Sequence, residues 1–210
     1  CYINVTIMCV GCLLNTVSET VTKTLQATLA TPTAGKEQRL QRLLDTYRDA
    51  LHDAFDNRAD TMSAVNDIVT PYDLPYQAKD ALKSYVPKLR STYNADKLDD
   101  EHPLRLVNRA ATFDYSEERD HGFVWQVPQP GRGTNFWIPL RINPEQESLW
   151  FDLLNGNAEA GELRLQKHRT SWELHVTVES TVEDPTESDD GTYIGFDVSQ
   201  TALITGLSLK

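Results

Sequence analysis

Cysteine is scarce in this chain, and the few cysteines stand where they cannot complete a metal site. Cys1, Cys9 and Cys12 are the only ones in the 210 residues, and all lie close to the start. A structural zinc site needs four ligands, and Cys9-Val-Gly-Cys12 supplies one ligand pair with no second pair after it. We therefore expect no zinc ribbon within these residues.

A long apolar run is missing too. Residues 1–14 are apolar, but they are too few to span a bilayer and lack the basic flank that begins a signal peptide. We interpret residues 1–17 as an extension that belongs to no domain, and we expect a cytoplasmic protein without a membrane partner.

Short motifs of the common enzyme classes are absent as well. The chain has no glycine-rich phosphate loop, no Gly-x-Ser-x-Gly turn, no kinase signature and no His-Glu-x-x-His pair of metal ligands. These absences argue against the familiar cofactor-dependent enzymes.

Positive charge is the scarcer sign, with 20 Lys and Arg against 31 Asp and Glu, a net charge of -11 and a pI of about 4.8. This balance argues against a polyanionic partner and fits a halophile's protein, which works in salt that weakens phosphate contacts steeply. The distribution is uneven, however. More than half of the basic residues lie between Lys36 and Arg109, whereas the excess acid lies mostly in Glu145–Glu162 and Glu173–Asp190. The overall charge therefore does not exclude a local basic surface.

The hydrophobic pattern changes its period along the chain. Ser18–Ala30 alternates polar residues with apolar ones, is rich in β-branched residues, and predicts one long strand. After Gly35, apolar residues recur every three or four positions, which predicts amphipathic helices over about Lys36–Arg58 and Tyr76–Tyr93. We expect Pro87 to kink or divide the second of these helices, because proline lacks a donor and clashes with the preceding turn.

Beyond the acidic loop Asn94–Pro103, strand patterns dominate. The predicted elements are strands over 123–127 and 136–142, a short helix over 144–154, and a hairpin of 163–167 with 171–179 whose Trp172, Leu174, Val176 and Val178 share one face. This order predicts an α+β fold, in which one antiparallel β domain (18–33 and 112–182) is interrupted by a helical insertion (34–111). An acidic linker follows at 183–191, and a new pair of strands at 192–210. The first strand is expected to pair with strands after Phe113.

Two clusters of basic side chains are candidate contacts to a nucleic-acid backbone. They are Lys79, Lys83, Lys88 and Arg90 on the Tyr76–Tyr93 helix, and Arg164, Lys167 and Arg169 on the hairpin. A basic stripe interleaved with tyrosines can lie along a phosphate backbone. The alternative is a solvated charged helix face, which has the same pattern.

Asp197 is the candidate catalytic and metal-binding residue. Strand alternation places it on the same face as Gly195, away from Ile194, Phe196 and Val198. Aspartate is disfavoured within strands, and glycine there often marks the close approach of a ligand. The alternative is an aspartate that happens to stand near a hairpin turn.

Two motifs together resemble the TnpB family of transposon-encoded, RNA-guided DNA endonucleases, in its haloarchaeal branch. They are the hairpin Leu163–Glu179, with its Trp-x-Leu-His-Val strand, and Tyr193-Ile-Gly-Phe-Asp-Val-Ser-Gln-Thr-Ala-Leu-Ile after a short linker. The resemblance implies a wedge-type antiparallel β-barrel followed by the first strands of a ribonuclease H-like (RuvC) domain. It also implies that Asp197 is the first of three catalytic acids, and that the partners are a guide RNA and a target DNA.

The chain departs from that family in two respects. Ser199 stands where the family usually has glycine, which leaves the carboxylate intact. The second and third RuvC acids and the zinc ribbon of the family are not within these residues, although cleavage with two Mg²⁺ ions needs several carboxylates. The chain is therefore interpreted as the N-terminal part of such a transposase-associated nuclease, with Mg²⁺ expected only in the complete enzyme. Two alternatives stay open: a truncated, non-catalytic nucleic-acid-binding protein or relic of the element, and an acidic β-rich interaction module without a nucleic-acid role.

Overall fold

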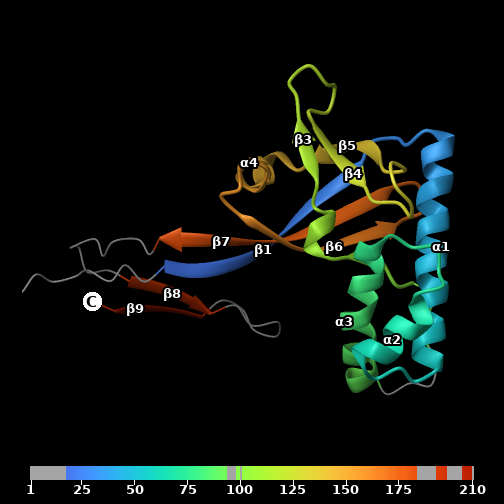
Figure 1. Ribbon diagram of the computed structural model, residues 1–210. Helices are drawn as coiled ribbons and strands as arrows, with labels where there is room; N and C mark the ends of the chain where they lie inside the picture. The colour runs from blue at the N-terminus through green and yellow to red at the C-terminus, as the bar shows by residue number, and fades with distance from the viewer. Residues whose placement is uncertain (1–17, 94–97, 100, 184–192, 198–204, 210) are drawn as a thin grey trace, which may run out of the picture. The chain divides into compact units, whose positions relative to one another are not determined.

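The computed structural model describes residues 18–93, 98–99, 101–183, 193–197 and 205–209 (Figure 1). The chain divides into two compact units. One is formed by Val21–Ser180, and the other by Cys1–Thr20 together with Thr181–Lys210. The N-terminal cysteines and most of the acidic linker lie outside the described residues.

The larger unit contains a seven-stranded sheet, three helices that form the insertion, and one short helix between later strands. Its helices are α1 (Ala34–Asp56), α2 (Met62–Val69), α3 (Tyr76–Thr92) and α4 (Glu147–Asn155), with 3-10 turns η1 (Asn108–Ala110) and η2 (Pro144–Gln146). Its strands are β2 (Leu104–Leu106), β3 (Phe113–Tyr115), β4 (Phe123–Val127), β5 (Phe136–Ile142) and β6 (Glu159–Lys167), together with most of β1 (Ser18–Leu29) and of β7 (Trp172–Glu183).

The sheet has the order β2-β6-β7-β1-β5-β4-β3 and curls into an antiparallel half-barrel (Figure 1). The pairing of β1 with β5 joins the two parts of the β domain across the helical insertion, with Thr28 opposite Arg141 and Leu29 opposite Leu140. This confirms the expected pairing of the first strand with strands that follow Phe113. It also brings together side chains that are far apart in the sequence.

Strand alternation decides which side chains enter the core. On β5, Phe136, Ile138 and Leu140 are buried, whereas Trp137 and Arg141 are exposed. All four residues predicted to share one face of β7 are buried. The hairpin register, with Leu165 opposite Leu174 and Lys167 opposite Trp172, agrees with the predicted turn.

The insertion is a block of three helices, of which α1 is the longest. Its residues at three- and four-residue spacing, including Leu40, Tyr47, Leu51 and Phe55, are buried, as its amphipathic pattern predicts. α3 continues through Pro87, so the proline does not divide the helix. Leu82 and Val86 are buried just before the proline, and this packing holds the helix together where one backbone hydrogen bond is missing.

One strand lies inside the range that the sequence assigned to the helical insertion. β2 is an edge strand that pairs with β6, placing Leu104 opposite Leu165 and Leu106 opposite Leu163. Both leucines of β2 are buried. Because the strand is only three residues long, its alternation is too short to distinguish it from the loop before it.

The smaller unit contributes β8 (Tyr193–Asp197) and β9 (Thr205–Leu209), which pair antiparallel with Asp197 opposite Thr205. A strand pair was expected at this place in the chain. Its assignment to a ribonuclease H-like domain stays a prediction.

Candidate nucleic-acid interface

The first basic cluster, on α3, makes several contacts within its own helical block. Lys79 Nζ donates a hydrogen bond to the Thr70 carbonyl at 2.7 Å, at the end of α2, where the last carbonyls of a helix lack intrahelical donors. Lys83 forms an ion pair with Asp80 at 3.0 Å on the same helix. Both lysines are only partly exposed. Because each already has a partner within the helical block, each has a structural role that does not require a bound phosphate.

The other two members of this cluster differ from each other. The Arg90 guanidinium lies 4.5 Å from the centroid of the Phe55 ring, a cation–π contact that joins α3 to α1. Lys88 is exposed, and within the described part of the chain its ammonium has no hydrogen bond or ion pair. Lys88 is thus the member of the α3 cluster most open to an external anion.

The second basic cluster lies on the β6–β7 hairpin. Arg164 forms an ion pair with Glu162, which precedes it on β6. Lys167 Nζ lies 3.1 Å from Glu37 Oε1 and 2.6 Å from Gln41 Oε1, so it ties the end of β6 to the first turns of α1. Arg169, in the hairpin turn, is exposed.

A cleft of about 390 Å³ opens where this hairpin turn meets α1 and the paired strands β1 and β5. Its polar lining includes Thr28, Thr31, Arg141, Lys167, Arg169 and Ser171. Three of these side chains are cationic, and Glu37 is the one carboxylate among the lining residues that the structure describes. Cations and hydroxyl groups are the donors that proteins commonly direct at phosphate oxygens.

Arg141 and Arg169 are the cations of this cleft with free guanidinium groups. Among the described residues, neither side chain has an ion pair, a hydrogen bond or a ring contact, and both are exposed. The sequence prediction included Arg169 but missed Arg141. The alternation of the Phe136–Ile142 strand indicates that Arg141 points outward. Arg141 lines the same cleft as Arg169 only because β1 pairs with β5 over a long sequence separation, which the alternation does not show.

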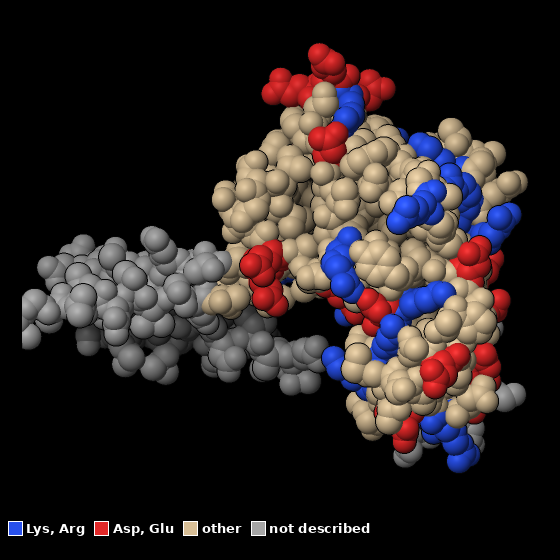
Figure 2. All heavy atoms as spheres, in the orientation of Figure 1, with Lys and Arg blue, Asp and Glu red and all other residues tan. Residues whose placement is uncertain are grey.

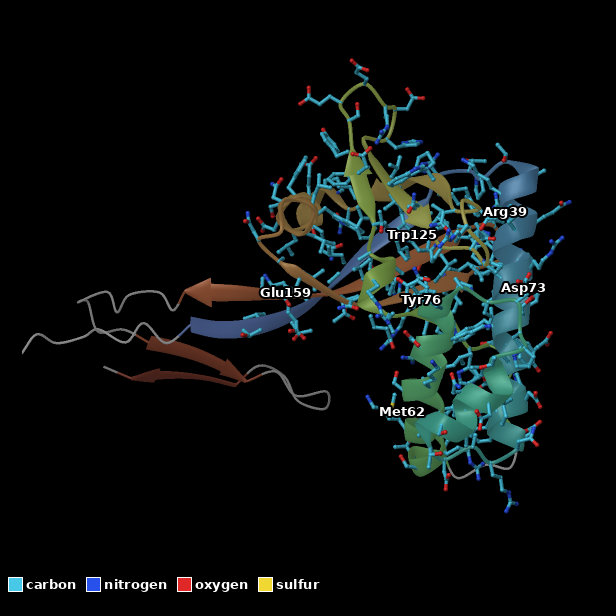
Figure 3. The ribbon with its side chains drawn as sticks, viewed as in Figure 1. Arg39, Met62, Asp73, Tyr76, Trp125 and Glu159 are labelled. Atoms are coloured by element: carbon cyan, nitrogen blue, oxygen red, sulfur yellow. The ribbon has the colours of Figure 1, made fainter. Side chains whose placement is uncertain are left out.

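A smaller hollow of about 170 Å³ lies along α1, lined by Arg39, Arg42 and Asp73 among others. Arg39 donates to the Thr134 carbonyl and lies 4.3 Å from the centroid of the Phe136 ring. Arg39 and Asp73, both labelled in Figure 3, come from α1 and from the connection between α2 and α3. Because Arg39 is already held by the sheet, this hollow offers fewer free donors than the larger cleft.

Basic and acidic side chains are interspersed over much of the larger unit, but each sign also has a region where it gathers (Figure 2). Basic side chains gather over α1 and the adjoining strand ends, whereas acidic side chains gather at the tip of the connection between β3 and β4. That connection carries the exposed residues Glu117, Glu118 and Asp120. An anionic polymer is therefore attracted to one part of the surface and repelled by the other.

A polar cluster around Arg105 fastens the helical block to the sheet. Arg105 Nη1 donates to both carboxylate oxygens of Glu162, at 2.8 and 2.9 Å, and its guanidinium lies 3.8 Å from the centroid of the Tyr85 ring on α3. Burial alone would lower the pKa of Arg105, but the Glu162 carboxylate outweighs burial and raises it. Burial also lowers the pKa of His102, whose Nδ1 lies 3.2 Å from the Tyr85 hydroxyl. These contacts hold the helical block on the sheet. They share the Glu162 carboxylate with Arg164, which forms its ion pair with the same residue.

The described residues do not fit a Mg²⁺ centre by themselves. Among them, no group of three or more His, Cys, Asp and Glu side chains could hold a metal ion. Asp197 ends β8, which is the backbone position expected for a strand carboxylate. One carboxylate does not hold two Mg²⁺ ions, so a metal centre would need acids from outside the described residues.

Comparisons with known proteins find a likeness among solved structures but none among protein families or curated proteins. No protein-family model and no curated protein matches the chain. A chain in the cryo-EM structure of a CRISPR-Cas12f ternary complex is similar, with a TM-score of 0.45 and 11% sequence identity, over 81% of this chain and 45% of that one. This chain thus spans less than half the length of the similar chain, and a likeness at this TM-score assigns it no function.

No helix in the described ranges is long and apolar enough to cross a membrane.

Proposed function

We propose that this chain is the nucleic-acid-binding, N-terminal part of a TnpB-type RNA-guided DNA endonuclease. The observation that carries the binding role is the cleft in which Arg141, Lys167 and Arg169 meet. Although the chain has a net charge of -11, Arg141 and Arg169 are both exposed, have no acidic partner in the described structure, and line the same cleft. Phosphates of a guide RNA or a target DNA are the ligands that this chemistry favours.

The TnpB-type assignment is supported by the agreement between motifs and topology. The family resemblance implies an antiparallel β-barrel, and the hydrophobic pattern predicts that a helical insertion interrupts it; β1 pairs with β5 across that insertion. It also predicts a strand with a carboxylate after the hairpin and linker, and Asp197 ends β8. In this proposal, base pairing with the guide reads the target, and the protein contacts backbones and recognises shape.

Asp197 is the residue of this chain that we propose for the nuclease site of the complete protein. Mg²⁺ would there activate water and stabilise the leaving oxygen. Because the described residues supply no further ligands, no step of that reaction is assigned to them. A cytoplasmic location belongs to the same proposal, since guide and target would be met there.

The alternative function is a non-catalytic protein that binds nucleic acid and lacks a nuclease site. The cleft favours both functions equally, because phosphate binding requires no catalytic acid. The two differ in whether further acids follow in the reading frame, which sequencing beyond Lys210 decides.

Replacement of Arg164, Lys167 and Arg169 together by alanine should weaken binding of a structured RNA by at least about tenfold at low salt. The slope of log K against log salt should flatten by about one unit for each phosphate that the variant no longer neutralises. Fluorescence anisotropy over a salt series measures both quantities. Arg164 and Lys167 already have internal ion pairs, whereas Arg169 has none among the described residues. Arg169→Ala alone should therefore flatten the slope of log K against log salt by a full unit.

Arg119→Ala is the matched control for these replacements. Arg119 is exposed and pairs with Asp114 at 2.7 Å, but it lies in the acidic β3–β4 connection. Its removal should leave the salt slope unchanged. An equal decrease of the slope in Arg119→Ala and Arg169→Ala would mean that overall charge, and not the cleft, governs binding.

Asp197→Ala in the purified 210-residue chain should leave RNA affinity within about twofold, because Asp197 lies outside the unit that carries the cleft. The chain itself should show no Mg²⁺-dependent DNA cleavage, since one carboxylate does not complete the site. Gel assays with labelled DNA, with and without Mg²⁺, test this. Cleavage that disappears in Asp197→Ala would contradict the assignment of the remaining catalytic acids to residues outside this chain.

A further inference from the structure

Two further hollows adjoin the cationic cleft near β1 and β5. Beside the cleft of about 390 Å³ lie two hollows of about 320 and 310 Å³. The first shares Thr31 and Pro32 with the cleft, and the second shares Thr28 and Arg141 with it. Each of the two hollows adjoins the cleft through these shared residues, and we refer to the cleft and the two hollows together as the groove; Arg141 lines both the cleft and the second hollow.

The charge of the groove is suited to a chain of phosphates in the cleft. The cleft has three cations against Glu37, and Glu37 is occupied because it accepts from Lys167 and from the Trp172 indole at 2.8 Å. The two hollows contain Asp120 and Glu173. A polyanion would therefore be held most strongly around Arg141.

Trp137 is the second feature of this surface. It stands on the same outward face of β5 as Arg141, and 39% of its area is exposed, whereas Trp125, Trp150 and Trp172 are at most 2% exposed. Lys36, which lines the groove, donates from its Nζ to the Trp137 carbonyl at 2.7 Å. A large ring left open to water, on the same strand face as the free cation Arg141, is an arrangement on which unpaired bases can stack.

The spacing of these residues fits a strand of nucleic acid. Trp137 and Arg141 are four residues apart on one strand, which corresponds to about 13 Å along β5. A base on Trp137 and a phosphate at Arg141 would belong to the same short stretch of a single strand. A duplex would not present a base face to the ring, because its bases are stacked on one another.

We propose that the outer face of β5 binds an unpaired stretch of nucleic acid, with a base stacked on Trp137 and phosphates held by Arg141 and Arg169. The inference rests on the proposed function for the presence of a nucleic acid, and adds that the strand is single at this place. Stacking on one ring tolerates any base, so this contact carries no sequence preference.

The test uses the fluorescence of Trp137 in the whole chain, titrated with oligo(U), oligo(dT) and a duplex of equal length. Saturation with either single strand should quench the emission, and the duplex should not. Trp137→Phe keeps an aromatic face, so it should bind single strands within about threefold of the natural chain but lose most of the quenching. Trp137→Ala should weaken single-strand binding about 5- to 100-fold and leave duplex binding unchanged.

The outcomes separate this inference from the proposed function. Quenching of undiminished amplitude in Trp137→Phe would come from another tryptophan, such as Trp172 in the wall of the cleft, and would overturn the stacking role. So would an equal weakening of single-strand and duplex binding in Trp137→Ala. If Trp137→Ala has no effect while Arg169→Ala flattens the salt slope, the cleft binds nucleic acid but β5 does not hold an unpaired base. Preference between oligo(U) and oligo(dT) shows whether the strand is RNA or DNA.

Discussion

Replacement of Trp172 by alanine is expected to lower the free energy of unfolding by about 3 to 5 kcal/mol. Trp172 begins β7, is 2% exposed and packs in the core of the larger unit. Its indole N–H donates to Glu37 on α1, and the Lys167 ammonium lies 5.1 Å from its ring centroid. Alanine would leave a cavity and remove the contact that joins the hairpin to α1.

Urea unfolding followed by circular dichroism measures this change, with Trp172→Phe as the control. Phenylalanine fills most of the space but cannot make the hydrogen bond to the Glu37 carboxylate, so its cost should be about 1 to 3 kcal/mol. Because Trp172 also lines the cationic cleft, Trp172→Ala should weaken RNA binding even where the protein stays folded. A destabilisation below about 1 kcal/mol in Trp172→Ala would mean that the hairpin does not depend on this contact.

The hairpin and α1 could be predicted from the sequence because their signals are local. Alternation placed Trp172, Leu174 and Val176 on one face, and all three are buried. Three- and four-residue spacing predicted α1 to within two residues at each end. Such patterns show which face of a helix or strand is buried, and they do so without any knowledge of the element that packs against that face.

The basic clusters show where a local pattern is insufficient. Lys79, Lys83 and Arg90 form a basic stripe in the sequence, but their contacts with Thr70, Asp80 and Phe55 depend on how α3 packs in the helical block. A stripe of this kind has the same appearance whether it faces a phosphate or a neighbouring helix. The phosphate-binding role of these three residues stays a prediction.

The candidate site itself depends on pairing over long sequence separations. Arg141 meets Arg169 because β5 pairs with β1, which is hydrogen-bonded on its other edge to β7. The general pairing could be expected from the interrupted β domain, but the register that sets Thr28 opposite Arg141 could not. For the same reason the predicted strand 136–142 includes Trp137 without indicating that its ring is exposed on the same surface as Arg141.

The ion pair between Arg105 and Glu162 gives the second large expected effect. Glu162→Gln should lower the free energy of unfolding by about 2 to 3 kcal/mol, because it removes a carboxylate that accepts two hydrogen bonds from Arg105. The Arg105 side chain is 16% exposed, so its charge would be left partly buried without its partner. Tyr85 would keep its ring contact with the guanidinium but could not replace the carboxylate.

The double replacement Arg105→Met with Glu162→Leu is the matched control for Glu162→Gln. It removes both charges, and apolar pairs of this kind commonly match or exceed the stability of the buried ion pair that they replace. We expect it to recover at least half of the lost stability in urea unfolding. Glu162→Gln also releases Arg164 from its ion pair, so RNA affinity of the folded variant should be unchanged or higher while stability falls. Equal destabilisation by Glu162→Gln and by the double replacement would show that the charge of Arg105 is solvated and that packing alone joins the helices to β2.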